Sequence, residues 1–160
     1  MKKTLLAFFL IITLFVAGCS TSSNTQESIN DLDVLNLEGK KMTVYKSPSC
    51  GCCNGHIEEY KRLGFEVEVV EQLDISDIKN QFEIPRDKQS CHTAVIDDYF
   101  VEGHVPTEAV LKLLKETPDV KGISLPGMPT GTPGMPGPKT APYKVFKMNN
   151  DKSFDEFITI

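Results

Sequence analysis

The sequence predicts a single α/β domain, and three observations support this prediction. The chain has 160 residues, 40% of them hydrophobic and 24% charged, which is enough for one ordinary domain and too few for two. A predicted helix stands between two predicted strands, which is the pattern of a parallel β-α-β unit. Two later strands are separated only by Asp97-Asp98, which predicts an antiparallel hairpin. We expect no second domain, and the sequence shows no internal repeat.

The elements of the β-α-β unit follow from the spacing of apolar residues. A β-branched and aromatic run predicts a buried strand at 42–46, and residues 47–53 follow it as a tight loop. Apolar side chains recur at helical spacing over 54–63, and Gly64 marks the end of that helix. Residues 65–70 alternate between apolar and acidic side chains, which predicts the second strand.

The next elements complete the plan. A helix is expected at 75–82, since its apolar residues share one helical face and Pro85 follows it. The hairpin strands are 93–96 and 99–101, and a helix over 106–116 comes next. A parallel unit followed by an antiparallel hairpin and a helix is the thioredoxin-like plan.

The C-terminal part differs in composition. Residues 121–142 are rich in Gly and Pro, which predicts a long structured arm, and 145–148 form a final short strand. The predicted fold is thus a thioredoxin-like single domain with a Gly/Pro/Met-rich C-terminal arm. Two Gly-Met-Pro units in the arm present Met128 and Met135 seven residues apart. Thioethers are soft donors that select Cu(I), which favours a metal or lid role for both methionines. The alternative is that they fill apolar gaps, the usual role of methionine.

The N-terminal segment predicts export. Two lysines precede an apolar run at 5–16, and small residues precede Cys19. The segment resembles the lipobox of bacterial lipoproteins, in which the cysteine is diacylated and becomes the new N-terminus. The predicted organisation is a lipoprotein signal peptide at 1–18, a flexible tether at 19–38 and the domain at 39–160. An uncleaved membrane anchor is the alternative, and both place the domain outside the cytosol at a membrane.

The charge of the chain argues against one class of partner. The formal net charge is −5. Without the first 18 residues, which hold two lysines and no acid, 15 basic and 22 acidic residues remain, a balance of −7. Nucleic-acid binding relies on Lys and Arg at the phosphates, so we expect no nucleic-acid partner.

Three cysteines, Cys50, Cys52 and Cys53, stand where the first strand passes into the first helix. Unpaired N–H groups at a helix N-terminus favour thiolate over thiol. Cys50 and Cys53 have the C-x-x-C redox spacing, and Cys52 adds a third soft donor. The cluster predicts thiol chemistry and a metal site, whereas a framework of two simple disulfides fits poorly because two of these cysteines are adjacent.

A fourth cysteine precedes the hairpin. The thioredoxin plan places this position beside the first strand-to-helix turn and puts a cis-proline there, but this chain has Cys91 and His92. Alternation along a strand predicts that Cys91 and His92 point to opposite sides, so His92 stays open as a ligand. We expect His56 at the surface, and His104 alone would be an ordinary residue near a helix start.

Four motifs together resemble the CopG-like family of small exported proteins, which are encoded near bacterial copper-resistance genes and were long described as a domain of unknown function. The resemblance covers 42–147 in the right order. The motifs are Tyr45-Lys-Ser-Pro-Ser-Cys-Gly-Cys-Cys53, Ser90-Cys-His-Thr-Ala-Val95, Val101-Glu-Gly-His-Val-Pro106 and Pro126-Gly-Met-Pro-x-Gly-x-Pro-Gly-Met135.

The resemblance implies a thioredoxin-like fold, copper binding and copper redox chemistry. Its partners would be copper ions, the membrane through the lipid anchor, and other copper-efflux or redox proteins. Many relatives look freely soluble, so the lipobox changes the expected location and not the chemistry. The implied metal ligands are Cys50, Cys52, Cys53 and Cys91 as thiolates, with His104 and, more weakly, Met128 and Met135.

Two other functions remain open at this stage. A membrane-tethered thiol–disulfide oxidoreductase would use Cys50 and Cys53, although the missing cis-proline and the surplus thiols weigh against it. A structural zinc site of four cysteines is the second alternative, and an exposed turn makes zinc less favoured than copper. The leading hypothesis is a protein that captures Cu(I) for sequestration, transfer or redox conversion.

Overall fold

The computed structural model describes residues 36–160. The predicted signal peptide, nearly all of the predicted tether and the lipidation site Cys19 lie outside this range. Within it, no helix combines the length and the apolar character needed to cross a membrane. Leu37, near the start of the described range, is already buried in the core.

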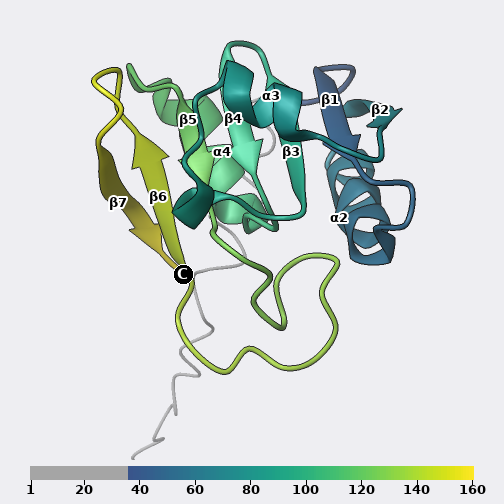
Figure 1. The fold of residues 1–160 in the computed structure, drawn as a ribbon. Coiled ribbons are helices and arrows are strands. Elements are labelled where there is room, and N and C mark those ends of the chain that lie inside the picture. Colours follow the sequence, from purple (N-terminus) through teal and green to yellow (C-terminus); the bar gives the residue numbers. More distant parts are fainter. Residues whose placement is uncertain (1–35) are drawn as a thin grey trace, which may run out of the picture.

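Seven strands form one mixed sheet in the order β2-β1-β3-β4-β5-β6-β7 (Figure 1). The β1–β2 and β4–β5 pairs are parallel, and the other neighbouring pairs are antiparallel. The strands are β1 (Lys41–Lys46), β2 (Glu66–Glu71), β3 (His92–Ile96), β4 (Tyr99–Glu102), β5 (Gly122–Ser124), β6 (Lys144–Met148) and β7 (Phe154–Thr159). The helices are α2 (Gly51–Arg62), α3 (Ser76–Gln81) and α4 (Thr107–Glu116), with a 3-10 turn at Arg86–Lys88.

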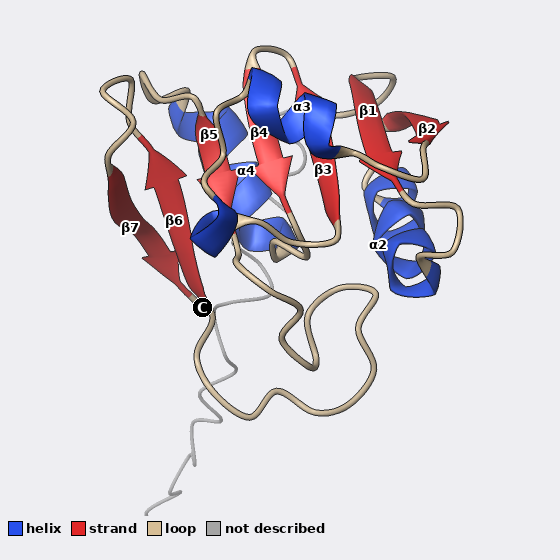
Figure 2. Ribbon diagram, viewed as in Figure 1, coloured by secondary structure: helices blue, strands red, loops and turns tan. Residues whose placement is uncertain are grey.

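The two faces of the sheet carry separate hydrophobic clusters. Neighbouring residues of a strand point to opposite faces, and in β4 Val101 belongs to the main cluster whereas Phe100 belongs to a smaller one. The main cluster also contains apolar residues of α2 and α4, so these helices cover one face. Figure 2 shows α3 and α4 on opposite sides of the sheet, and Phe82 at the end of α3 packs in the smaller cluster.

The predicted β-α-β unit, hairpin and α4 are confirmed, and so is the mixed α/β single-domain class. The prediction of a loop over 47–53 is wrong at its end, because α2 begins at Gly51. The predicted arm likewise contains β5, and the sequence analysis missed β7. β5 has only three residues, all buried, too few to show alternation, and the register between β6 and β7 shifts at Val145/Phe146, which breaks a simple pattern.

The thioredoxin-like description of the fold stays a prediction. Residues 36–160 contain no cis peptide bond, and the position where the thioredoxin plan has a cis-proline holds Cys91 and His92. Between β5 and β6 the chain forms the arm, which Figure 1 shows as the long green loop below the sheet.

Candidate metal centre

The helix-start cysteines occupy the first turn of α2. Cys50 is the residue before the helix, and its N–H donates to the Ser47 carbonyl oxygen over 3.0 Å. Cys52 and Cys53 follow inside the helix. No side chain caps this helix start and its first turn has no acidic residue, so its free N–H groups can stabilise a thiolate.

Cys91 joins this cluster from the other segment. Its Sγ lies 3.5 Å from the Sγ of Cys53, a residue 38 positions away in the chain. The Sγ atoms of Cys50 and Cys52 are 3.6 Å apart, and all four sulfurs lie within 4.8 Å of one another. The expectation that these two distant stretches meet is confirmed.

The cluster is partly oxidised. Cys50 and Cys53 form a disulfide with a Cα–Cα distance of 5.4 Å, whereas Cys52 and Cys91 are free. A cysteine binds metal as a thiolate and a disulfide sulfur does not, so two cysteine sulfurs are available in this state and four after a two-electron reduction. The number of sulfur donors is therefore set by the redox state of one C-x-x-C pair.

Two histidines extend the donor set on the side of Cys91. The sulfur of Cys91 is 3.1 Å from His104 Nε2 and 3.4 Å from His92 Nδ1. The donor atoms of Cys53, Cys91, His92 and His104 lie within 4.8 Å of one another. The prediction that Cys91 and His92 point to opposite sides is wrong, because β3 begins at His92 and Cys91 lies in the preceding bend, where alternation does not apply.

His56 is buried beneath this set, so the prediction of a surface position is wrong. Its Nδ1 lies 3.1 Å from His92 Nε2, and its ring stacks on Tyr60 with centroids 4.3 Å apart. Cys53, His56, Ile57 and Tyr60 are the buried residues of α2. Their i, i+3, i+4, i+7 spacing is the signal in the sequence that could have placed His56 inward.

Burial determines the protonation of the three histidines. It lowers the pKa of His56 to about 3, with the neighbouring His104 as a further cause. The pKa values of His92 and His104 are also lowered, in both cases mainly by burial. The rings are therefore neutral at pH 7, and a neutral imidazole is the form that binds a metal.

Burial has the opposite effect on the neighbouring thiol. It raises the pKa of Cys91 to about 11, and the nearby Cys52 adds to the shift. Cys91 thus keeps its proton at pH 7 in the absence of a cation. A bound cation would replace that proton, because metal coordination stabilises the thiolate.

The arm closes one side of the set and orients His104. The Pro133 carbonyl oxygen is 2.8 Å from His104 Nδ1. Because a carbonyl oxygen only accepts, Nδ1 carries the proton and Nε2 presents its lone pair to Cys91. The next residue, Gly134, packs against the start of α2, where a Cβ atom would meet the Cys52 carbonyl oxygen at 2.4 Å.

The two arm methionines differ in exposure. Met128 is 53% exposed, whereas Met135 is half-buried and its N–H donates to the Thr132 carbonyl oxygen over 2.8 Å. Met135 directly follows Gly134, which packs against the helix start. A ligand role for either thioether stays a prediction.

Comparisons with known proteins point to one family. A family model described as "Protein of unknown function, DUF411" matches residues 88–135. A solved structure named "Copper resistance protein copG- Form 1" is 36% identical with a TM-score of 0.71, and the match covers 77% of this chain and 98% of that one. The chain belongs to the CopG-like family. "Form 2" of the same protein has the same identity and TM-score and is covered to 99%. Comparison with curated sequences found no match.

The family model covers one side of the metal centre in this CopG-like chain, the side formed by Cys91, His104 and the arm. Cys91, His104 and Pro133 all lie within 88–135. The three helix-start cysteines lie outside that range, and the solved structures, which cover most of the chain, extend the likeness beyond it.

A buried ion pair supports Cys91 in this CopG-like chain, and the sequence analysis missed it. Lys79 Nζ pairs with Glu102 and also donates to Thr93 Oγ1 over 3.1 Å. Glu102 Oε1 accepts the N–H of Ser90 over 2.6 Å, and Oε2 accepts the Thr93 hydroxyl over 2.6 Å. The carboxylate thus holds the backbone directly before Cys91. The only hint in the sequence was that Lys79 shares the apolar helical face predicted for 75–82.

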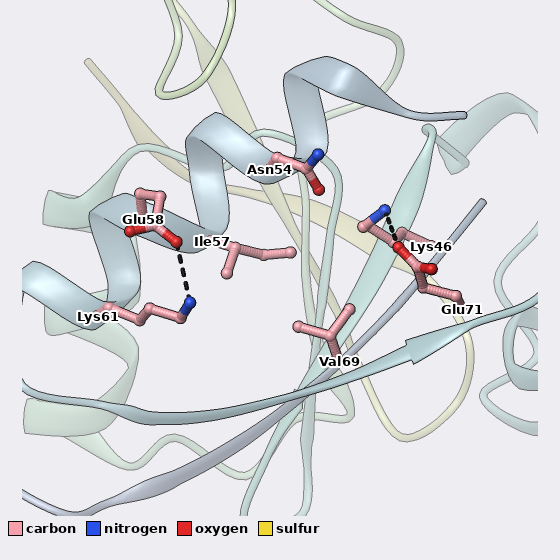
Figure 3. Close-up of a pocket in the computed structure, with 7 residues that line it drawn as sticks. All are labelled: Lys46, Asn54, Ile57, Glu58, Lys61, Val69 and Glu71. Carbon is pink, nitrogen blue, oxygen red and sulfur yellow. Dashed lines mark hydrogen bonds and ion pairs between the residues drawn. The ribbon is translucent and has the colours of Figure 1, made fainter. Parts of the chain in front are cut away.

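The CopG-like chain also has a groove away from the cysteines. It has a volume of about 440 Å³ and lies between α2 and the β1–β2 edge of the sheet (Figure 3). Its lining residues are Lys46, Asn54, Ile57, Glu58, Lys61, Val69 and Glu71. Lys46 Nζ pairs with Glu71 over 2.7 Å between the neighbouring ends of β1 and β2. These residues offer ion pairs and apolar contact but no soft donor, so the metal chemistry belongs to the sulfur cluster.

Proposed function

We propose that this chain captures Cu(I) outside the cytosol with the thiolates of its sulfur cluster. The observation that carries the proposal is the meeting of four sulfurs, from two distant segments, within 4.8 Å. Thiolates are soft ligands, and soft ligands select Cu(I) over harder ions. The family supports copper as the cargo, because the similar solved structures are named copper resistance proteins.

The redox state of the C-x-x-C pair would set the capacity of the site. With the disulfide closed, Cys52 and Cys91 are the free thiols, and two neutral histidines stand beside Cys91. After reduction, Cys50 and Cys53 add two more thiolates. The chain would hold copper tightly when reduced and loosely when oxidised, which suits sequestration, transfer and redox conversion alike. The assignments of Met128 and Met135 as further soft donors belong to this proposal.

Anaerobic Cu(I) titration against a chromophoric chelator tests the proposal. The reduced full chain is expected to bind at least one Cu(I) tightly, and the oxidised chain fewer. The double variant Cys50→Ser/Cys53→Ser should lose this tight binding. The matched control is Ser47→Ala/Ser49→Ala in the same loop, where two exposed hydroxyls bond each other and no sulfur is removed. Tight binding of less than one Cu(I) by the reduced chain contradicts the proposal.

We also propose that the mature chain is anchored to the outer side of a membrane by a lipid on Cys19. The support is the lipobox-like sequence at the end of the apolar run. Fractionation of cells tests this proposal. The native chain should sediment with membranes, and Cys19→Ser should not carry a lipid. An unmodified Cys19 in the native chain, observed by mass spectrometry, would refute the anchor.

A thiol–disulfide oxidoreductase is the second candidate, favoured by the Cys50–Cys53 disulfide at the start of α2. This spacing at a helix N-terminus is typical of exchange catalysts. Insulin reduction by the chain should survive Cys52→Ala and Cys91→Ala if this activity is the function. Loss of the reduction in those variants would mean that Cys50 and Cys53 do not act alone.

A further inference from the structure

The two sulfurs of the disulfide differ in what can reach them. Cys53 has an exposed fraction of 0%, whereas Cys50 is only half-buried at the edge of the site. A thiol from outside can therefore approach Cys50 but not Cys53. The free thiol of Cys91 already lies 3.5 Å from Cys53 Sγ. The buried half of the disulfide thus has a nucleophile supplied by the chain itself.

That nucleophile stands beside a base that is held in place. The thiolate is the attacking species in disulfide exchange, so a protonated Cys91 needs an acceptor for its proton. His104 Nε2 lies 3.1 Å from Cys91 Sγ, and the Pro133 carbonyl oxygen binds the opposite ring nitrogen over 2.8 Å. Nucleophile, base and a third group that orients the base make the arrangement of an activated nucleophile.

We propose that Cys91 attacks Cys53 and moves the disulfide from the Cys50–Cys53 pair to a Cys53–Cys91 pair. His104 Nε2 takes the Cys91 proton, and the sulfur of Cys91 forms a bond with Cys53 Sγ. The Cys50–Cys53 bond breaks, and its electron pair leaves with Cys50 as a thiolate. His104 then releases the proton to solvent. One disulfide is lost and one is formed, so the step needs no outside oxidant or reductant.

The exchange changes which thiols the oxidised chain presents. Before it the free pair is Cys52 and Cys91, on two different segments. After it the free pair is Cys50 and Cys52, both at the start of α2, where the unpaired N–H groups favour thiolates. The oxidised chain thereby regains two neighbouring soft donors, and Cys50 is free to react again with an outside disulfide.

Disulfide mapping of the metal-free full chain tests the exchange. Trypsin releases Cys50, Cys52 and Cys53 together on 47–61 and Cys91 separately on 89–112. The chain is fully reduced, oxidised with one equivalent of diamide, and quenched with acid at intervals. We expect the fraction of linked peptides to keep rising after the diamide is consumed, up to a plateau. A plateau below about 1% of the once-oxidised chain overturns the proposal.

Variants separate the exchange from other routes. Cys91→Ser should abolish the linked peptides, and Ser49→Ala, in the exposed part of the loop, should leave both plateau and rate unchanged. Exchange through Cys52, whose sulfur is 3.6 Å from Cys50, would keep the disulfide inside peptide 47–61. A disulfide that stays within 47–61 therefore overturns the transfer to Cys91.

His104→Gln tests the base, since an amide of similar size cannot take up the proton. A base changes the rate and not the equilibrium, so we expect the same plateau with a half-time at least about tenfold longer. An unchanged half-time, or a shifted plateau at the normal rate, overturns the role of His104. These measurements contain no copper, so their failure leaves the copper proposal standing, and failure of the copper titration leaves the exchange standing.

Discussion

The two sides of the sulfur cluster are built in different ways. Cys50, Cys52 and Cys53 lie within four consecutive residues, and the first turn of α2 alone brings them together. Cys91 and His104 instead come from the two ends of a hairpin, joined where the Gly103 N–H donates to the His92 carbonyl oxygen over 2.9 Å. The arm then adds the Pro133 carbonyl to this second side.

This difference means that the two sides respond to different kinds of damage. The helix side depends on local backbone, so only changes to the cysteines or the helix start should disturb it. The hairpin side depends on strand register, a buried ion pair and the packing of the arm. Variants far from any sulfur should therefore weaken the site from the hairpin side.

The largest effect is expected at the ion pair behind Cys91. Glu102→Ala leaves Lys79 as a buried charge without its carboxylate partner, and removing one partner of a buried pair costs about 3–5 kcal/mol. Urea denaturation measures this loss in free energy of unfolding. Replacing both residues by apolar ones, Lys79→Met with Glu102→Leu, should restore most of the stability. A double variant as unstable as Glu102→Ala would show that the single loss does not come from the unpaired charge.

Metal binding should add stability without being required for folding. Neither hydrophobic cluster contains a cysteine, although Cys53 is fully buried, so most of the core packs without the metal site. A cargo ion at 100 times its dissociation constant adds about 2.7 kcal/mol to the free energy of unfolding. Thermal melting of the reduced chain, with Cu(I) and after chelation, measures this shift.

Structural zinc predicts a different outcome of the same experiment. A structural zinc site contributes folding energy outright, and small zinc domains unfold when the metal is removed. Unfolding on chelation, together with zinc in the elemental analysis of protein purified without added metal, would favour zinc. A cooperative melt of the chelated chain favours a cargo ion.

The same difference between the two sides explains what the sequence could predict. The helix-start cysteines were identified because neighbours in sequence are neighbours in space. Cys91 was identified because the order of elements places the start of the third strand beside the first strand-to-helix turn. Only the family resemblance put His104 with Cys91 in one ligand set, and the contact of His104 with Pro133 was not predicted, since these contacts join three segments and have no spacing in the sequence.

Errors at the ends of elements had large consequences. Moving the start of α2 forward to Gly51 adds Cys53 to the buried stripe that His56 shares with Tyr60, and starting β3 at His92 removes Cys91 from strand alternation. Boundaries are the least certain part of sequence-based assignment, because caps and tertiary contacts compete there. The pair of Lys79 and Glu102 was missed for another reason, since two charges 23 residues apart carry no local pattern.

The arm offers a smaller and sharply controlled effect. Gly134 (φ +80°) and Gly127 (φ +71°) both have left-handed backbone. A Cβ at Gly134 would clash with the Cys52 carbonyl oxygen at 2.4 Å and with His56 N at 2.6 Å. A Cβ at Gly127 would meet nothing within 4 Å. Backbone strain is therefore common to both alanine variants. Gly134→Ala should cost about 1–3 kcal/mol more than Gly127→Ala, the usual cost of overpacking.

The arm variants also test whether the packing of the arm supports the metal site. Gly134→Ala should displace the Pro133 carbonyl from His104 and weaken Cu(I) binding, whereas Gly127→Ala should bind Cu(I) like the native chain. Equal Cu(I) affinities for the two variants would mean that the arm does not support the site. The comparison uses the same chelator competition as the cysteine variants.

The smallest effect is expected at Glu83, an exposed residue bound to Lys121 and Lys152. Hydrogen bonds from these two lysines lower the pKa of the Glu83 carboxyl from 4.5 to about 2. A lowered carboxyl pKa adds stability above the unfolded-state value, and this contribution is lost as the pH falls from about 4.5 to about 2. Glu83→Gln should therefore destabilise the chain slightly at pH 7 and not at pH 2, with a difference that shrinks in high salt because the pair is exposed. Urea midpoints at the two pH values measure this difference in stability.

Cu(I) affinity at pH 7 should stay unchanged in Glu83→Gln, because Glu83 bonds to neither side of the sulfur cluster. A loss of affinity in this variant would show that the fragility of the site extends beyond the hairpin side.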